Sequence, residues 1–99
     1  MDDNMFMTVS HWSIDQVTDE MIAEAEAEFM PMILDTGAEH AYMVQTGEDS
    51  MMVVVQFPNS DTGQSALPKI GAIREMAANK FGMTLQNAVA GVVRAHRKS

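Results

Sequence analysis

Residues 51–57, MMVVVQF, decide the fold of this chain. Their β-branched and aromatic side chains favour a strand, and the Pro58 that follows ends it. Both alternating sets of side chains are apolar, whereas a strand with one face in water alternates apolar and polar residues. Residues 89–93, VAGVV, repeat this pattern. We therefore expect a sheet that needs cover on both of its faces.

The flanking sequence supplies two further strands and the first of two helices. Residues 5–14 (MFMTVSHWSI) and 39–45 (EHAYMVQ) are rich in β-branched and aromatic side chains, and residues 46–50 are a turn of hairpin length. Thr18 is the expected N-cap of the first helix, and Gly37 is its expected end. The apolar side chains of this helix recur on a 3.6-residue period. They are Ile22, Ala25, Phe29, Met32 and Ile33.

The second helix follows residues 59–61, any of which can cap it, and Gly82 is its expected end. Because Gly63 and Pro68 lie in its early part, we expect a loose first turn or a break there. We likewise expect Pro31 to kink or tighten the last turn of the first helix. The apolar side chains of the second helix also keep helical spacing: Leu67, Ile70, Ile73, Ala77 and Phe81.

With residues 85–95 as the last strand, the order is strand, helix, strand, strand, helix, strand. This order predicts an α+β fold of ferredoxin-like βαββαβ type, with a four-stranded antiparallel sheet and two helices on one face, in a single domain over residues 1–99. The bare face would exceed the few hundred Å² of apolar surface that a monomer tolerates. Burying about 700 Å² per chain at about 25 cal/mol/Å² contributes on the order of 15 kcal/mol before association costs. We therefore expect a homodimer joined through the open sheet face.

Composition limits the partners and the compartment. Fourteen acids against six bases give a net charge of −8, which disfavours nucleic acid as a partner. The basic tail, residues 94–98, is expected to be a solvated terminus. No apolar run approaches the roughly 20 residues of a membrane span, and residues 1–4 are acidic, unlike the start of a secretory signal. The absence of cysteine excludes disulfides and thiolate metal sites, and we expect an acidic protein of the reducing cytoplasm.

Four residues are candidate pocket residues, and no catalytic residue is identified. His40 and Tyr42 are two positions apart on one strand and therefore share a face, where they could serve acid–base function and hydrogen-bond an aromatic ligand. Surface or dimer contacts are the alternative for this pair. His11 and Trp12 are neighbours that point to opposite faces, so only one of them can face the helices and line a cavity. The three histidines lie on different strands without HxH or HExxH spacing, so we expect no metal site.

Residues 6–9 (FMTV), 29–33 (FMPMI), 41–57 and 91–96 (GVVRAH) together cover most of the chain as a pattern. In these passages the chain resembles the dimeric α/β-barrel proteins, and in particular the antibiotic biosynthesis monooxygenase-like (ABM-like) group. The resemblance implies a pocket between the sheet and its helices. Enzymes of this group oxidise small aromatic or polyketide-like molecules there, often without a cofactor, or degrade haem. Trp12 does not match the haem-degrading pattern, and none of the family's catalytic residues is carried over.

Two functions remain open at this level. The first is a cofactor-independent monooxygenase-like enzyme, or a binder of a small apolar or aromatic molecule, and no cofactor is expected for it. The second is a non-catalytic homodimeric structural or interaction module. The eleven methionines fit both, because this adaptable side chain can fill a core or line a pocket. A cavity under the helices favours the first function, and a solid interior favours the second.

Overall fold

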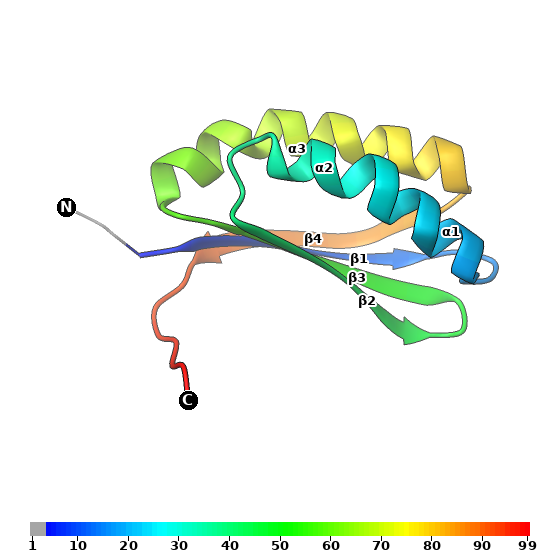
Figure 1. The fold of residues 1–99 in the computed structure, drawn as a ribbon, viewed down its shortest axis with the longest axis horizontal. Helices are drawn as coiled ribbons and strands as arrows, with labels where there is room; N and C mark the ends of the chain where they lie inside the picture. The colour runs from blue at the N-terminus through cyan, green and yellow to red at the C-terminus, as the bar shows by residue number, and fades with distance from the viewer. Residues whose placement is uncertain (1–3) are drawn as a thin grey trace.

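The computed structural model describes residues 4–99, in which one antiparallel sheet carries helices on a single face (Figure 1). The strand order in the sheet is β2-β3-β1-β4. The strands are β1 (Phe6–Ser13), β2 (His40–Gly47), β3 (Ser50–Phe57) and β4 (Thr84–Val92). This is the ferredoxin-like βαββαβ order, so the predicted fold class is confirmed. The expectation drawn from the acidic residues 1–4 lies largely outside the described residues.

Three consecutive segments form the first helix: α1 (Asp19–Glu24), the π-helical η1 (Ala25–Phe29) and α2 (Met30–Leu34). As predicted, Thr18 caps this helix, and its Oγ1 accepts a hydrogen bond from the Met21 N–H at 3.2 Å. The effect of Pro31 differs from the expectation of a tightened last turn. Pro31 has no N–H, and its ring crowds the carbonyl four residues earlier. The chain widens into a π turn just before Pro31, where the Met30 N–H donates to the Ala25 carbonyl.

Gly82 is the C-cap of α3 (Ser60–Phe81) as predicted, whereas α2 (Met30–Leu34) already ends at its C-cap Asp35, two residues before the predicted Gly37. Gly37 has φ 110°, and Gly82 has φ 64°. Residues with a side chain rarely adopt such positive φ values. Asn59 is the N-cap of α3, and its Oδ1 accepts a hydrogen bond from the Thr62 N–H at 2.8 Å. The start of each helix and the end of α3 are therefore set by local capping, as the sequence predicts.

The helix α3 is continuous, which corrects the expectation of a loose or broken first turn. Gly63 is buried on the side of α3 that meets β1, and a Cβ atom there would clash with Cδ2 of the Phe6 ring. The missing side chain is what lets the helix and the strand approach each other. Pro68 is exposed, so the carbonyl that loses its hydrogen bond can be hydrated. Close packing at Gly63 thus outweighs the weak helix propensity of both residues.

The buried stripes of the helices differ from the prediction by one residue. Met21 is buried in the first helix, where the prediction has Ile22. Ala66 is buried in α3, whereas the predicted Leu67 is 37% exposed. Adjacent helical residues are only about 100° apart around the axis, so the periodicity fixes the direction of a stripe to about one residue.

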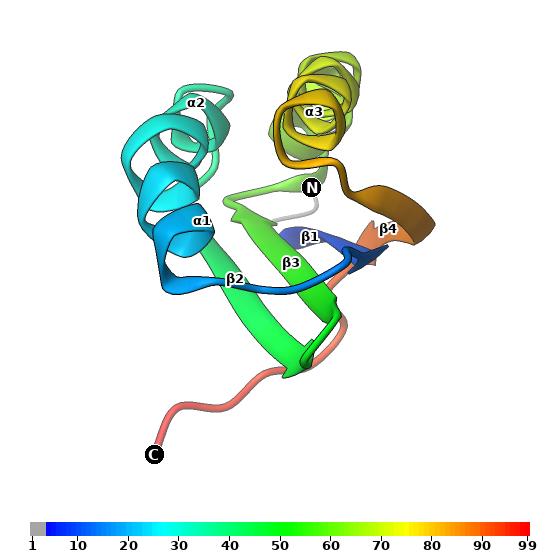
Figure 2. The ribbon, with the colours of Figure 1, turned by 90° about the vertical axis from the view of Figure 1, so that its right-hand side faces the viewer.

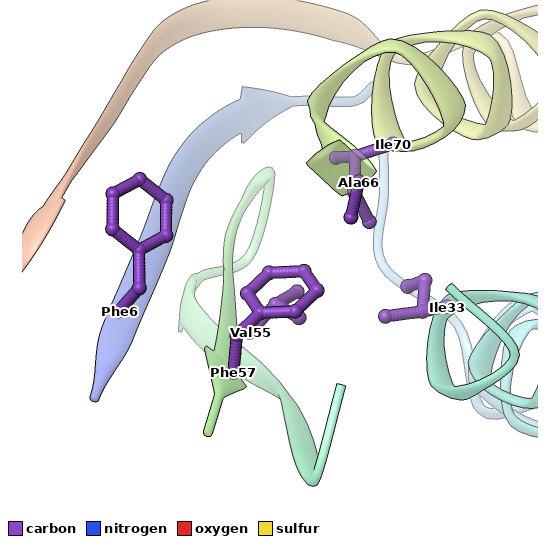
Figure 3. Close-up of a cluster of buried hydrophobic side chains, with 6 residues drawn as sticks. All are labelled: Phe6, Ile33, Val55, Phe57, Ala66 and Ile70. Carbon is purple, nitrogen blue, oxygen red and sulfur yellow. The ribbon is translucent and has the colours of Figure 1, made fainter. Parts of the chain in front are cut away.

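Side chains from four elements meet between the sheet and the helices (Figure 3). They come from β1, β3, α2 and α3, and they are Phe6, Ile33, Val55, Phe57, Ala66 and Ile70. A second cluster lies toward the other end of the same strands and consists of Trp12, Met21, Met51 and Met83. Each large apolar side chain contributes about 1.5–3 kcal/mol when fully buried. These clusters hold the helices on one face of the sheet.

The opposite face, called the open face below, carries no helix or strand of residues 4–99, and the C-terminal tail after β4 leaves the sheet on this side (Figures 1 and 2). Cross-strand partners point to the same side of a sheet, so the strand register assigns the members of this face. They are Met7, Val9, His11, Ser13, His40, Tyr42, Val44, Gly47, Ser50, Met52, Val54, Gln56, Thr84, Asn87, Val89 and Gly91. None of them carries a formal charge with His neutral, although 20% of the chain is charged. The predicted sheet with two largely apolar faces is present, and one chain covers one of them.

Replacing Gly63 with Ala places a methyl group against the Phe6 ring. We expect this change to lower the free energy of unfolding by about 1–3 kcal/mol, because overpacking forces α3 away from β1. Gly71 is the matched control in the same helix, since an added Cβ there meets no atom of another element within 4 Å. Gly71→Ala should raise stability by about 0.5–1 kcal/mol. Urea unfolding followed by circular dichroism at one protein concentration measures both, and equal effects would contradict the close approach at Gly63.

Candidate functional site

A cavity lies between the sheet and the two helices that cover it. In Figure 2, the first helix and α3 stand side by side over different halves of the sheet. The centre of a water molecule has about 60 Å³ of room inside it. The whole hollow, including solvent at its mouth, holds about 580 Å³ of empty space. The smaller volume is the space that is free without movement, because the larger one includes open solvent. One water needs roughly 10–15 Å³ of such room, so the cavity as it stands has space for a few waters or about one aromatic ring.

Two side chains of β1 supply hydrogen-bonding groups on the sheet side of the cavity. Trp12 is 4% exposed and donates its indole N–H to Oγ of Ser10 at 2.8 Å. The two residues share the helix-facing side because they are two positions apart on the strand. Among residues 4–99 no acceptor takes the hydroxyl hydrogen of Ser10. A ligand in the cavity can therefore accept a hydrogen bond from Ser10 while Trp12 fixes the position of its oxygen.

Arg74 is the charged residue of the cavity lining. It is half-buried on α3, between the lining residues Ile70 and Ala77. No carboxylate in the described part of the chain pairs with it. Desolvation by burial lowers the pKa of its guanidinium from the ordinary value, but an arginine remains charged at neutral pH. Arg74 is thus a half-buried cation beside an apolar cavity, without a carboxylate partner among the described residues.

Lys80, further along α3, shows the contrasting case of a paired cation. Its Nζ donates a hydrogen bond to Oε2 of Glu28 and lies 3.9 Å from Oε2 of Glu24. The bond to Glu28 raises the pKa of Lys80. The adjacent Phe29 and Phe81 rings meet edge to face, with centroids 5.4 Å apart. These contacts join the first helix to α3 beside the cavity, although exposed ion pairs of this kind contribute little to stability.

The walls of the cavity are adjustable. Four methionines line it: Met21, Met30, Met43 and Met83. Methionine is unbranched and polarisable, so its side chain moves aside for ligands of different shape. Ala25 and Phe29, the first and last residues of the π turn, also line the cavity. Such turns are frequent at functional sites, and the space available to a ligand can exceed the space seen without one.

The structure separates the four candidate residues taken from the sequence. Trp12 lines the cavity, while His11 points to the open face, so the predicted alternation of these neighbours is present. His40 and Tyr42 share a face as predicted, and their rings are stacked with centroids 6.3 Å apart. That face is the open face, on the other side of the sheet from the cavity. The sheet therefore lies between Trp12 and the other three candidates.

Sequence reasoning missed Arg74 and Ser10. Arg74 interrupts the apolar stripe of α3 four residues after Ile70 and three before Ala77, and a lone cation inside such a stripe is a usable signal. Ser10 precedes Trp12 by two positions, so a hydroxyl on the same face as the indole was readable from the alternation. The sequence alone does not show that Arg74 lacks a carboxylate partner.

Residues 4–99 contain neither a metal-binding cluster nor a membrane-spanning helix. No group of three or more His, Cys, Asp or Glu side chains there is placed to hold a metal ion. No helix of the same range is both long and apolar enough to span a bilayer. The cavity is therefore the candidate functional site.

Comparison with known proteins supports the fold. No family model and no curated protein matches the sequence. Among solved structures, the chain is similar to SnoaB, a cofactor-independent oxygenase from Streptomyces nogalater, with a TM-score of 0.63 and 13% identity over 96% of each chain. It is also similar to a dimeric ferredoxin-like protein from an uncultured marine organism, with a TM-score of 0.59 and 9% identity over 97% of this chain and 93% of the other.

A third similar structure is a protein from Deinococcus radiodurans named for the antibiotic biosynthesis monooxygenases, with a TM-score of 0.56 and 11% identity over 95% of each chain. The predicted resemblance to ABM-like proteins is confirmed at the level of the fold. At these identities the likeness concerns the fold alone.

Replacing Ser10 with Ala leaves the buried indole N–H of Trp12 without its acceptor. We expect a loss of about 1–3 kcal/mol in the free energy of unfolding and a shift of the fluorescence of Trp12, the one tryptophan in the chain. Thr8 is the matched control, because it is 1% exposed on the same face and its Oγ1 has no partner among residues 4–99. Thr8→Val should be neutral or stabilising. A loss as large as that of Ser10→Ala would show that the indole hydrogen bond is not the cause.

Proposed function

We propose that this protein is a homodimeric, cofactor-independent monooxygenase-like enzyme that binds a small aromatic molecule with an acidic group in the cavity under its helices. The observation that carries the proposal is Arg74, a half-buried cation without a carboxylate partner in the wall of an otherwise apolar cavity. Similar structures include a cofactor-independent oxygenase, which supports the reaction class.

The size and lining of the cavity support an aromatic ligand. Phe29, Phe81 and Trp12 provide ring surfaces, and the methionines provide polarisable contacts. Ser10 offers one hydrogen-bond donor to a polar substituent of the ligand. Ligand pockets generally combine such apolar walls with a few polar groups that fix orientation.

The charge of the ligand follows from what the lining contains. The lining residues include Arg74 but no His, Asp or Glu that would act as a general base. A substrate that binds here therefore enters already ionised, as a carboxylate, an acidic phenol or an enolate. The guanidinium of Arg74 then holds the anion through charge-assisted hydrogen bonds.

The same charge state suits oxygenation without a cofactor. An electron-rich phenolate or enolate can itself donate electrons to O₂, so neither a metal nor a flavin is required to supply them. Apolar walls exclude water from the reactive anion, which prevents side reactions. In this role Arg74 stabilises negative charge on the substrate while Ser10 and Trp12 hold the ring in place.

A second copy of the chain is the proposed cover of the open face. Four strands about 4.8 Å apart, each about eight residues long at about 3.3 Å per residue, span roughly 500 Å² in projection. Protruding side chains enlarge the accessible area toward the roughly 800 Å² per partner of a standard interface. The face has no formally charged residue, and depletion of charge marks the core of interfaces. A similar structure is described as a dimeric ferredoxin-like protein.

The alternative is a non-catalytic homodimeric module. The small volume that is free without side-chain movement, about 60 Å³, favours it. The two functions differ in what happens to a ligand: a module without a site takes up no aromatic acid, a binder takes it up unchanged, and the enzyme consumes O₂ with it.

Benzoate and benzyl alcohol, which share a ring and differ in charge, test the cavity. We expect benzoate to change the fluorescence of Trp12 saturably, and Arg74→Gln to weaken benzoate binding by about 10–100-fold while leaving benzyl alcohol within about threefold. Lys69→Gln is the control, since Lys69 is an exposed cation of the same helix outside the cavity lining. Equal weakening by both substitutions would show that net charge, and not Arg74, attracts the anion.

Oxygen uptake with acidic phenols and enols that are already ionised at the assay pH tests the reaction itself. We expect a saturable rate in an oxygen electrode that Arg74→Gln abolishes and Lys69→Gln retains. Binding of these acids without oxygen uptake would reduce the proposal to a binding protein. Absence of both would favour the non-catalytic module.

Replacing Val9 with Lys tests the homodimer. Val9 lies on the inner strand β1 between Val54 and Val89 of the open face. A lysine there can extend its charge into water in the single subunit but is trapped between two sheets in a dimer, so we expect the dissociation constant to rise about 100-fold or more. Met76→Lys is the control, because Met76 is 46% exposed on α3. Sedimentation equilibrium measures both, and a dimer unaffected by Val9→Lys would place the interface elsewhere.

A further inference from the structure

His11 lies in the inner part of the open face. It is on β1, with Met52 of β3 and Asn87 of β4 as its cross-strand neighbours. Val9 and Ser13 flank it two positions away on its own strand and the same face. None of these four neighbours is charged, and the side chain of His11 is exposed in the single subunit. A positive charge at His11 therefore has water as its stabilising environment and no anion among these neighbours.

The other titratable side chains of the open face are His40 and Tyr42, both on the edge strand β2. Three carboxylates near the ends of these strands belong to loops: Asp15, Glu48 and Asp49. A fourth, Glu39, directly precedes β2, and its Oε1 accepts a hydrogen bond at 3.4 Å from Nε2 of Gln56, which is on the edge of the open face away from His11. The cations of residues 94–98 follow the end of β4. Asp and Glu ordinarily titrate near pH 4, and Tyr, Lys and Arg near pH 10 or above. Histidine is the type of side chain that ordinarily changes charge between about pH 5 and pH 8.

We infer that acid dissociates the homodimer, and that protonation of His11 is what separates the two copies. The inference rests on the homodimer in the proposed function. When two open faces meet about a two-fold axis, both copies of His11 are enclosed between the sheets. A neutral imidazole can remain there and hydrogen-bond a polar neighbour such as Asn87. An imidazolium loses its hydration and meets no counter-ion, so the charged form binds the partner more weakly.

The size of the effect follows from linkage. A dimer that excludes one proton at each His11 gains up to two protons when it dissociates, so its dissociation constant rises by up to about 100-fold per pH unit in the acid range. His40 contributes less, because it is the first residue of an edge strand at the rim of the face, where water reaches it. The switch thus uses one inner residue per chain.

Sedimentation equilibrium at about pH 8 and about pH 5.5 tests the inference. Both pH values are above the pI of about 4.5, so the protein has a net negative charge at each of them. We expect the wild-type dimer to dissociate at the lower pH. His11→Gln should remain dimeric at both values, and His40→Gln, the matched control, should dissociate like the wild type. His11→Lys carries its charge throughout and should be monomeric even at about pH 8. Circular dichroism at each pH confirms that the subunits stay folded.

The possible results distinguish a failure of acid dissociation from a failure of the proposed homodimer. A wild-type protein that is monomeric at about pH 8 removes the homodimer and the inference together. A wild-type dimer that persists at about pH 5.5 leaves the homodimer standing and overturns the inference. Acid dissociation that persists in His11→Gln, or disappears in His40→Gln, overturns the assignment to His11, because carboxylates or the other histidine are then responsible.

Discussion

The structure depends on a sheet with two largely apolar faces and helices for only one of them. Phe57, Val55 and Met51 of β3 are buried beneath the helices, while Met52 and Val54 of the same strand point the other way. Because β3 and β1 are the inner strands, neither apolar set can be displaced to an edge of the sheet. One face therefore becomes the core and the cavity, and we propose that the other becomes the contact with a second copy.

The cavity exists because the helices are fixed at separated points. At one end Gly63 lets α3 lie directly against Phe6 of β1. At the other end the Phe29 and Phe81 rings join the first helix to α3. Between these contacts, short and flexible side chains leave room beside Arg74. An anion-binding residue in an adjustable apolar space is a simple arrangement for holding an ionised aromatic molecule, and the other face of the same sheet is free to hold the partner subunit.

The sequence predicted the parts of the structure that depend on local pattern. The order of strands and helices along the chain, the Thr18 cap and the Gly82 cap follow from residues close together in the chain. The continuity of α3 did not follow, because the fit of Gly63 against Phe6 involves residues far apart in the sequence. Periodicity also left each buried stripe uncertain by one residue. It could not show that Ala66, and not Leu67, is the buried residue of α3.

The candidate site was less accessible from the sequence. Alternation placed His40 with Tyr42 and separated His11 from Trp12. Alternation did not show which of these residues face the helices, because apolar residues occupy both sides of these strands. Arg74 was visible as a cation in an apolar stripe, but its lack of a partner is a property of the fold.

Small-angle X-ray scattering of the wild-type protein near neutral pH tests the central claim most directly. The claim is that one chain cannot cover both faces of its own sheet. We expect a particle of twice the 10.9 kDa chain mass, with a radius of gyration clearly above the 13.6 Å of one subunit. A folded particle of 10.9 kDa with a radius of gyration near 13.6 Å would contradict the claim, because the open face would then be stable in water.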